Sequence, residues 1–125
     1  MEHAVGRLHQ LAITVASVET ALPFYRDVLG LNFLFSAGPD LAFLSDGAVR
    51  FMLSKPQGAG QPGANSPLYF LVADVEASFA AITGRGAVPE RAPQMAAQMP
   101  DHQLWIGFVR DPDGNLIGLM EERRG

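Results

Sequence analysis

The sequence of 125 residues contains no cysteine. Disulfide bonds, thiolate metal sites and cysteine nucleophiles are therefore excluded. Basic residues are also few, because nine Lys and Arg stand against thirteen Asp and Glu, and the formal net charge is −4. A protein that binds nucleic acid through its phosphates has the opposite balance, so we expect no nucleic-acid partner.

Long apolar runs are lacking as well. No run approaches the roughly 20 residues that a membrane-spanning helix needs. The start, Met1-Glu2-His3, has no basic segment followed by an apolar core, as a signal peptide would. We therefore expect a cytoplasmic protein without membrane contact. Apolar residues still make up 48% of the chain, which is enough to pack the core of one domain.

Hydrophobic periodicity divides the first half of the chain into one strand, one helix and three further strands. Alternating apolar residues predict the first strand at residues 8–15. Ser17 is a suitable N-cap, and apolar residues at helical spacing predict a helix that ends at Gly30. Three short apolar runs predict strands, the last two joined by a tight turn at Asp46-Gly47: residues 31–35, 41–44 and 49–53.

The second half of the chain repeats the first. Residues 11–19 (LAITVASVE) and 68–76 (LYFLVADVE) are identical at five of nine positions, with a shift of 57 residues. A helix capped by Asp74 and running to about Ile82 is predicted next, followed by strands at residues 88–91, 104–110 and 116–120. We expect a single domain made of two βαβββ modules and a linker: module 1–54, linker 55–66 and module 67–125.

Three motifs accompany the repeat: FYRDVLGL at residues 24–31, VADVEA at 72–77 and DPDGN at 111–115. Together with the paired modules, they resemble the vicinal oxygen chelate superfamily, which includes glyoxalase I, bleomycin-resistance proteins, fosfomycin-resistance enzymes and extradiol dioxygenases. The resemblance implies an α+β fold of tandem βαβββ modules that form a curved half-barrel around a cleft. It also implies that two chains pair into a homodimer. The residue types of the motifs already satisfy helix and turn rules, so they predict scaffold and not chemistry.

Clefts of this superfamily commonly hold a divalent metal, and the resemblance implies four ligand positions. These positions fall at Gln10, Met52, Pro67 and Gly118, with Phe51 in place of Met52 if the register slips by one. Only Gln10 offers an oxygen, whereas a divalent ion needs imidazole nitrogens or carboxylate oxygens. We therefore predict no metal ligands at the usual site and no cofactor. Strand parity turns the neighbouring His9 toward the helix.

Strand parity also predicts which side chains line the cleft. Arg50 is the cation that would pair with an anionic ligand. His102 stands at the mouth of the strand 104–110, where an imidazole would serve as a general base or orient a ligand, or would be a solvated loop histidine beside Asp101. The predicted ligand-binding set is Gln10, Phe43, Arg50, Met52, Tyr69, His102, Phe108 and Met120, with His102 also the candidate catalytic residue.

Two functions remain open at this point. One is a metal-independent protein that binds a small apolar or aromatic molecule in the cleft, as the bleomycin-resistance branch does. The other is a glyoxalase- or dioxygenase-like lyase or oxidoreductase whose metal site is relocated around His102 and Gln10, with Glu90 or Asp101 as a further ligand. In both cases the partner is a small molecule.

Overall fold

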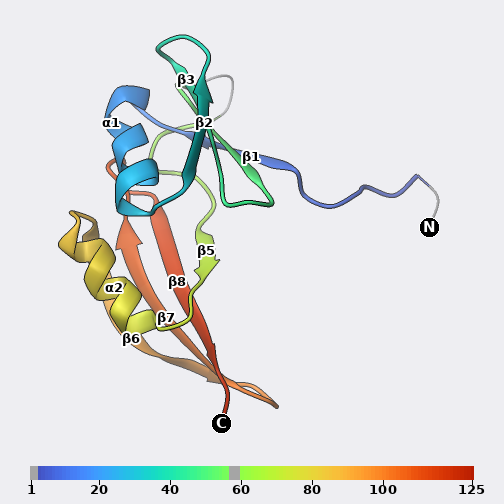
Figure 1. Ribbon diagram of the computed structural model, residues 1–125, viewed down its shortest axis with the longest axis vertical. Helices are drawn as coiled ribbons and strands as arrows, with labels where there is room; N and C mark the ends of the chain where they lie inside the picture. The colour runs from blue at the N-terminus through green and yellow to red at the C-terminus, as the bar shows by residue number, and fades with distance from the viewer. Residues whose placement is uncertain (1–2, 57–59) are drawn as a thin grey trace.

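The computed structural model describes residues 3–56 and 60–125, which form two modules (Figure 1). The first contains β1 (Gln10–Thr14), α1 (Val18–Pro23), the π-helical turn η1 (Phe24–Val28), β2 (Asn32–Ser36), β3 (Leu41–Ser45) and β4 (Arg50–Ser54). The second contains β5 (Leu68–Leu71), α2 (Val75–Gly84), β6 (Val88–Gln98), β7 (Gln103–Arg110) and β8 (Leu116–Arg123). The predicted α+β fold with two βαβββ modules is thus confirmed. Part of the predicted linker, residues 57–59, lies outside the described residues.

Each module builds a four-stranded mixed sheet with the same strand order. The first sheet has the order β1-β4-β3-β2 and the second β5-β8-β7-β6. In the parallel pairs, Ala12 lies opposite Met52 in the first sheet and Tyr69 lies opposite Gly118 in the second. The 57-residue shift of the sequence repeat carries Ala12 onto Tyr69, so Met52 and Gly118 occupy equivalent positions. The register of the strands therefore reproduces the internal repeat.

The first helix changes its geometry halfway. Ser17 caps it as predicted, since its Oγ accepts a hydrogen bond from the Thr20 N–H at 3.2 Å. Pro23 has no N–H to continue the α-helical pattern. The following residues form the wider π-helical turn η1, in which the Leu29 N–H donates to the Phe24 carbonyl at 2.9 Å. The sequence predicted one continuous helix here, because periodicity does not distinguish the two hydrogen-bond patterns.

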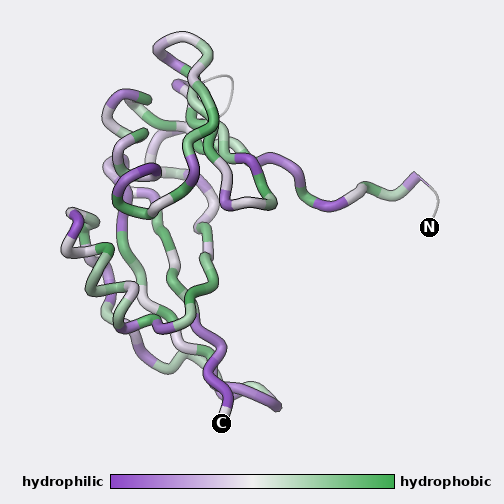
Figure 2. Tube along the Cα trace, viewed as in Figure 1, coloured by the Kyte–Doolittle hydropathy of each residue, from purple (hydrophilic) through white to green (hydrophobic). Residues whose placement is uncertain are grey.

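The core lies between the helices and one face of each sheet. In β4, Phe51 and Leu53 are buried and alternate with half-buried residues that point to the other face. The core continues from one module into the other, where the rings of Phe51 and Phe70 stack with centroids 5.9 Å apart. Figure 2 shows apolar stretches along the strands and a hydrophilic C-terminal end. Within the described residues, neither helix has the length and apolar character needed to cross a bilayer.

A buried polar contact joins the two modules. The Tyr25 hydroxyl, on η1, donates a 2.6 Å hydrogen bond to Oδ2 of Asp111 in the turn between β7 and β8. Burial of the phenol, reinforced by the Asp111 carboxylate, raises the pKa of Tyr25 above its usual value. Asp111 also accepts from the backbone and side chain of Asn115. The motifs FYRDVLGL and DPDGN therefore meet, and together they fix the second module against the first.

Strand β6 is longer than the sequence predicted. It continues to Gln98, whereas the predicted strand stopped at Arg91. Pro89 and Pro93 interrupt the alternation of side chains, and the pairing with β7 shifts register at three points. Proline is tolerated because β6 is the edge strand of its sheet. The outcome is a long β6–β7 hairpin that extends past the helix α2 (Figure 1).

Candidate functional site

Each sheet has one face turned away from its helix, and both of these open faces carry aromatic and thioether side chains. Their side chains are half-buried or exposed, in contrast to the buried residues that alternate with them. We define the first open face by Gln10, Ala12, Phe35, Phe43, Arg50 and Met52. We define the second open face by Tyr69, Leu71, Leu104, Phe108 and Met120.

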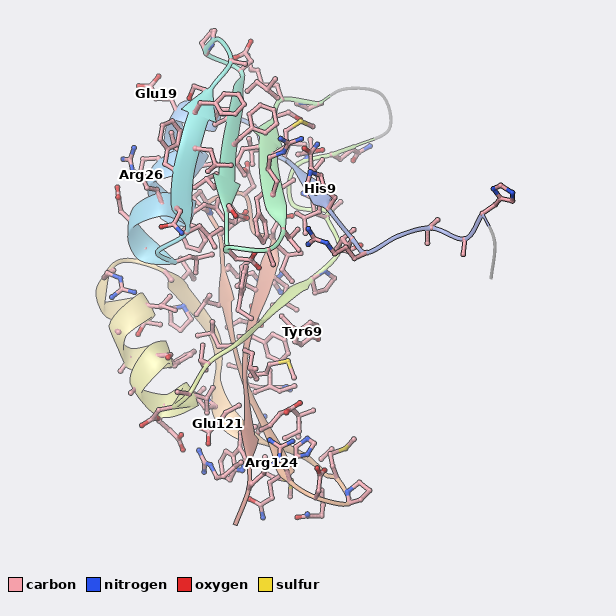
Figure 3. The ribbon with its side chains drawn as sticks, turned by 45° about the vertical axis from the view of Figure 1, so that its right-hand side comes forward. His9, Glu19, Arg26, Tyr69, Glu121 and Arg124 are labelled. Atoms are coloured by element: carbon pink, nitrogen blue, oxygen red, sulfur yellow. The ribbon has the colours of Figure 1, made fainter. Side chains whose placement is uncertain are left out.

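The polar centre of the first open face is a contact between Gln10 and Arg50. Arg50 Nε donates to Gln10 Oε1 at 2.6 Å, and Gln10 Nε2 lies 3.8 Å from the sulfur of Met52. The guanidinium carbon of Arg50 lies 5.4 Å from the centre of the Phe43 ring, which stacks on Phe35 at 4.7 Å. These contacts bring four of the predicted ligand-binding residues together on one face. Gln10 belongs to this face, and the neighbouring His9 is exposed just before β1 (Figure 3).

The second open face is organised around Phe108 and the glycine beside it. The Tyr69 ring covers Gly118 so closely that a Cβ at that glycine would lie 2.6 Å from it. Tyr69 also meets Phe108 edge to face, with ring centroids 5.8 Å apart. Phe108 forms the floor of a pocket of about 350 Å³, whose other walls are Glu90, Arg91, Arg110 and Leu116. Tyr69 and Phe108, both predicted from the sequence, are thus in contact, and Met120 lies on the same face two residues after Gly118, the residue opposite both.

A smaller pocket of about 180 Å³ opens between the modules. It is mainly apolar and includes Tyr69, and its lining is Leu11, Asp46, Val49, Phe51, Leu68, Tyr69 and Phe70. Two of these lining residues, Phe51 and Phe70, have stacked rings. This pocket lies beside the core and contains no residue of the first open face.

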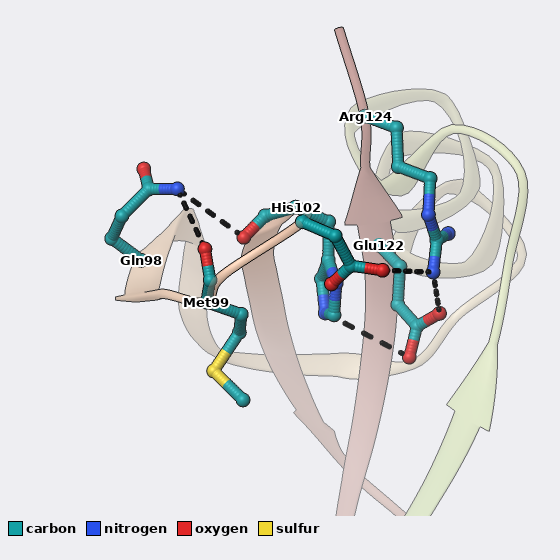
Figure 4. A network of polar contacts seen from close by, with 6 residues as sticks. Gln98, Met99, His102, Glu122 and Arg124 are labelled. Carbon is teal, nitrogen blue, oxygen red and sulfur yellow. Dashed lines mark hydrogen bonds and ion pairs between the residues drawn. The ribbon is translucent and has the colours of Figure 1, made fainter.

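His102 lies at the tip of the β6–β7 hairpin (Figure 4), whereas Gln10 begins β1 in the other module. Its Nδ1 is 2.8 Å from Asp101 Oδ1 and its Nε2 is 3.9 Å from Glu122 Oε2. The hydrogen bond from His102 is the main cause that lowers the pKa of Asp101. Arg124 contacts both carboxylates, at 3.6 Å and 3.3 Å. These residues border an open pocket of about 530 Å³, lined by Gln98, Pro100, Asp101, His102, Gln103, Arg123, Arg124 and Gly125.

The residues considered for a relocated metal site are not gathered in one place. Gln10 belongs to the first module, whereas Asp101 and His102 lie at the hairpin tip, and Glu90 pairs with Arg110. None of the three pockets described above contains both Gln10 and His102.

Among the described residues, the one group of three close acidic or histidine ligand atoms is Asp74, Glu76 and Glu121. Asp74 caps α2 by accepting from the Ala77 N–H at 3.0 Å. Arg123 donates to both Glu76 and Glu121, and its hydrogen bond lowers the pKa of Glu121 to about 2. Arg123 therefore pairs with two of the three carboxylates, and Asp74 and Glu121 accept from N–H groups at the start of α2, so the group has a structural explanation.

The four positions that the resemblance marks as metal ligands do not offer the donors of a divalent ion. The Oε1 of Gln10 already accepts from the Arg50 guanidinium, which places a positive charge beside it. Met52 supplies a thioether, and neither Pro67 nor Gly118 has a ligating side chain. Hard and borderline divalent ions prefer carboxylate oxygens and imidazole nitrogens. The residues present therefore do not fit such an ion.

Arg91 is a residue of the site that sequence reasoning missed. Its guanidinium carbon lies 5.0 Å from the centre of the Phe108 ring, at the wall of the second open face. The bulges of β6 on both sides of Arg91 break the strand parity on which the sequence analysis relied. The signal in the sequence was the pair of prolines around it, which indicates an irregular edge strand.

Comparisons with known proteins bear on the fold and the family of the chain. Three solved structures share the fold: an antibiotic binding protein from Streptomyces, a lactoylglutathione lyase from Agrobacterium tumefaciens and a virulence protein from Salmonella typhimurium. The first has a TM-score of 0.79 and 24% identity, covering 97% of this chain and 99% of its own. The second has a TM-score of 0.78 and 20% identity, with coverage of 94% and 95%. The third has a TM-score of 0.78 and 24% identity, with coverage of 95% and 98%.

At these identities the structural likeness establishes the fold alone. A search of curated protein sequences gives no match. The model of one family, described as the Glyoxalase/Bleomycin resistance protein/Dioxygenase superfamily, matches residues 7–119, a range that begins before β1 and ends within β8. The chain therefore belongs to the glyoxalase/bleomycin resistance protein/dioxygenase superfamily.

Proposed function

We propose that this protein binds a small apolar or aromatic molecule between a first and a second open face, without a metal ion. The observation that carries the proposal is the pair of aromatic clusters, Phe35 with Phe43 and Tyr69 with Phe108. Half-exposed rings on a sheet bury a flat ligand efficiently, and a few polar groups such as Gln10 orient it. The antibiotic binding protein from Streptomyces supports the proposal as an example of this fold that captures a small molecule.

The proposed binding needs no metal ion, because the side chains at the four usual ligand positions lack suitable donor atoms. Catalysis of the glyoxalase or dioxygenase kind needs a metal as Lewis acid. The side chains at the four equivalent positions supply one amide oxygen, and Arg50 already holds it. Binding without metal-dependent chemistry is the function that this set of side chains supports best.

We further propose that two copies of the chain form the cleft together. Within the described residues of one chain, none of the three pockets combines the two open faces. Large apolar side chains on them remain exposed: Leu71 at 68%, Tyr69 at 50% and Phe35 at 48%. A homodimer in which the first open face of one copy meets the second open face of its partner would cover them.

The N-terminal segment supports the same assembly. Residues 3–6 extend away from the two modules, as Figure 1 shows. Val5 is 95% exposed and Leu8 is 63% exposed, so most of the surface of each side chain is left uncovered by its own chain. A second copy would give this arm an apolar surface to contact.

Calorimetric titration with the neutral planar molecule 2-naphthamide, alongside a panel of larger aromatic compounds, tests the proposal. Phe43→Ala and Phe108→Ala should each weaken binding about ten-fold, because each variant loses the contact between one aromatic ring and the ligand. Phe33→Ala is the matched control, since Phe33 is 40% exposed on the same sheet and pairs with the buried Leu44, away from the first open face.

Two results would contradict the proposal. One is the failure of every compound in the panel to bind saturably. The other is an equal loss of affinity in the Phe33→Ala control. For the dimer, sedimentation at micromolar concentration should give twice the 13.4 kDa chain mass, and a single 13.4 kDa species would exclude it.

A further inference from the structure

The pocket on the second open face contains an arginine that has no acidic partner among the residues described by the structure. Arg110, on one wall, is neutralised, because its Nε donates to Glu90 Oε1 at 2.9 Å and its Nη1 donates to the Gly114 carbonyl at 2.9 Å. Arg91, on another wall, makes no hydrogen bond or ion pair with any residue that the structure describes. It lies over the Phe108 ring at 5.0 Å. The pocket thus carries one uncompensated positive charge.

This charge stands out against the composition of the chain, whose formal net charge is −4. Most other arginines with contacts in the structure are paired with carboxylates, as Arg26 is with Asp27 and Arg123 is with Glu121. A guanidinium that stacks on a ring keeps the N–H donors along its edge free. Those donors form a planar fork that matches the two oxygens of a carboxylate.

Arg50, the cation that strand parity predicted for an anionic ligand, is in a different situation. Its Nε is committed to Gln10, and none of the three pockets contains it. Arg91 has both a free donor edge and a pocket of about 350 Å³ with an aromatic floor. The space beside it suits an aromatic ring whose acidic group reaches the guanidinium.

We propose that this pocket is an anion subsite and that the ligand is an aromatic molecule bearing a carboxylate. The aromatic part lies against Phe108 and Tyr69, and the carboxylate pairs with Arg91. This inference rests on the proposed function, because it specifies the chemistry of the molecule that the open faces bind.

The test compares two probes that differ in charge and share one ring system, 2-naphthoate and 2-naphthamide. At low salt, the unmodified protein should bind the carboxylate about ten-fold more tightly than the amide. R91Q should abolish this preference, and the ratio of the two affinities is the readout, because the loss of the guanidinium over the Phe108 ring acts on both probes. R26Q is the matched control, since Arg26 is exposed on η1 and its loss changes the net charge equally. Backbone amide shifts at Phe108 and Gly118 in NMR spectra locate the bound probe.

Each outcome separates the inference from the proposed function. Equal affinities for the two probes would overturn the anion subsite and leave small-molecule binding intact. If neither probe nor any compound of the panel binds, both proposals fail. A preference for 2-naphthoate that persists in R91Q would overturn the role of Arg91. If R26Q loses the preference as fully as R91Q does, the preference comes from the net charge of the protein and not from Arg91. Raising the salt concentration should shrink a preference that comes from an exposed charge.

Discussion

The two modules share one register but differ at equivalent positions of their open faces. Phe43 pairs with Met52 in the first sheet, and Phe108 pairs with Gly118 in the second. Met52 fills its position with a flexible side chain, whereas Gly118 leaves room that the Tyr69 ring occupies. The backbone pattern of the repeat has thus been kept while the side chains have diverged. The two open faces therefore differ, because the first is filled by packed side chains and the second contains a charged pocket.

The β-turns that precede the last strand of each module differ in the same manner. Asp46, in the first module, is exposed and accepts hydrogen bonds within its own turn, from the Ala48 and Val49 N–H groups. Asp111, at the corresponding turn of the second module, is 3% exposed and reaches across to Tyr25. One aspartate shapes a local turn, and the other connects the modules and so fixes the position of the second open face.

The largest effect is expected from removing these two aspartates in turn. Asp111→Ala leaves the Tyr25 hydroxyl and the Asn115 amide buried without an acceptor, which should lower the free energy of unfolding by about 3 kcal/mol. Asp46→Ala should cost about 1 kcal/mol, since water replaces its local bonds. Urea denaturation of the two variants measures both values. Equal costs would mean that Asp111 acts only within its turn.

A smaller effect is expected from making the second module resemble the first at Gly118. Gly118→Ala pushes the Tyr69 ring away from Phe108 and should cost about 1 kcal/mol, because a half-exposed ring is free to swing outward. In a Tyr69→Ala background the same substitution should cost close to nothing. A double-mutant cycle of unfolding free energies measures the difference. Equal costs in both backgrounds would show that Tyr69 does not occupy this space.

On the first open face, Gln10→Ala should lower the free energy of unfolding by about 0.5–1 kcal/mol, because the hydrogen bond to Arg50 is lost. This effect is smaller than the one expected for Gly118→Ala. His9→Ala is the control, because this neighbour is exposed and its side chain has no partner among the described residues; it should change stability by less than about 0.5 kcal/mol. Thermal or urea unfolding distinguishes the two. A larger loss of stability in His9→Ala than in Gln10→Ala would show that His9, and not Gln10, belongs to the first open face.

The smallest effect is expected from chelation. Neither Gln10 in the first module nor Pro67 in the second provides a ligand for a divalent ion, so EDTA should leave the melting temperature unchanged. Elemental analysis of protein purified without chelator is the complementary measurement. Near-equimolar zinc, iron, nickel or manganese would contradict the account.

Much of the fold was predictable from the sequence because its signals are local. Alternation, the caps Ser17 and Asp74 and the turn Asp46-Gly47 depend on neighbours in the chain, and the structure contains all of them. Side-chain parity in the regular strands β1 and β4 likewise follows from the backbone geometry. The irregular strand β6 was not predictable, because two prolines and three register shifts remove the alternation.

The candidate site was predictable only in part. Which residues share a face follows from parity, and this placed Gln10 beside Met52. Which faces meet depends on how the modules pack, and that packing rests on Tyr25 and Asp111, which are 86 residues apart. A hydrogen bond at such a separation leaves no periodic signal. For the same reason, parity could not show that His102 and Gln10 lie in different parts of one chain.

The most direct test of the central claim is complementation between two defective variants. Phe43→Ala damages the first open face and Phe108→Ala the second. In a mixed dimer, one cleft carries both damaged faces and the other carries two intact ones. After the variants are mixed and allowed to exchange, about a quarter of all clefts should therefore regain unmodified affinity for 2-naphthamide. Recovery of that fraction in a calorimetric titration is the predicted result. No recovery would show that the open faces of different copies do not form the cleft.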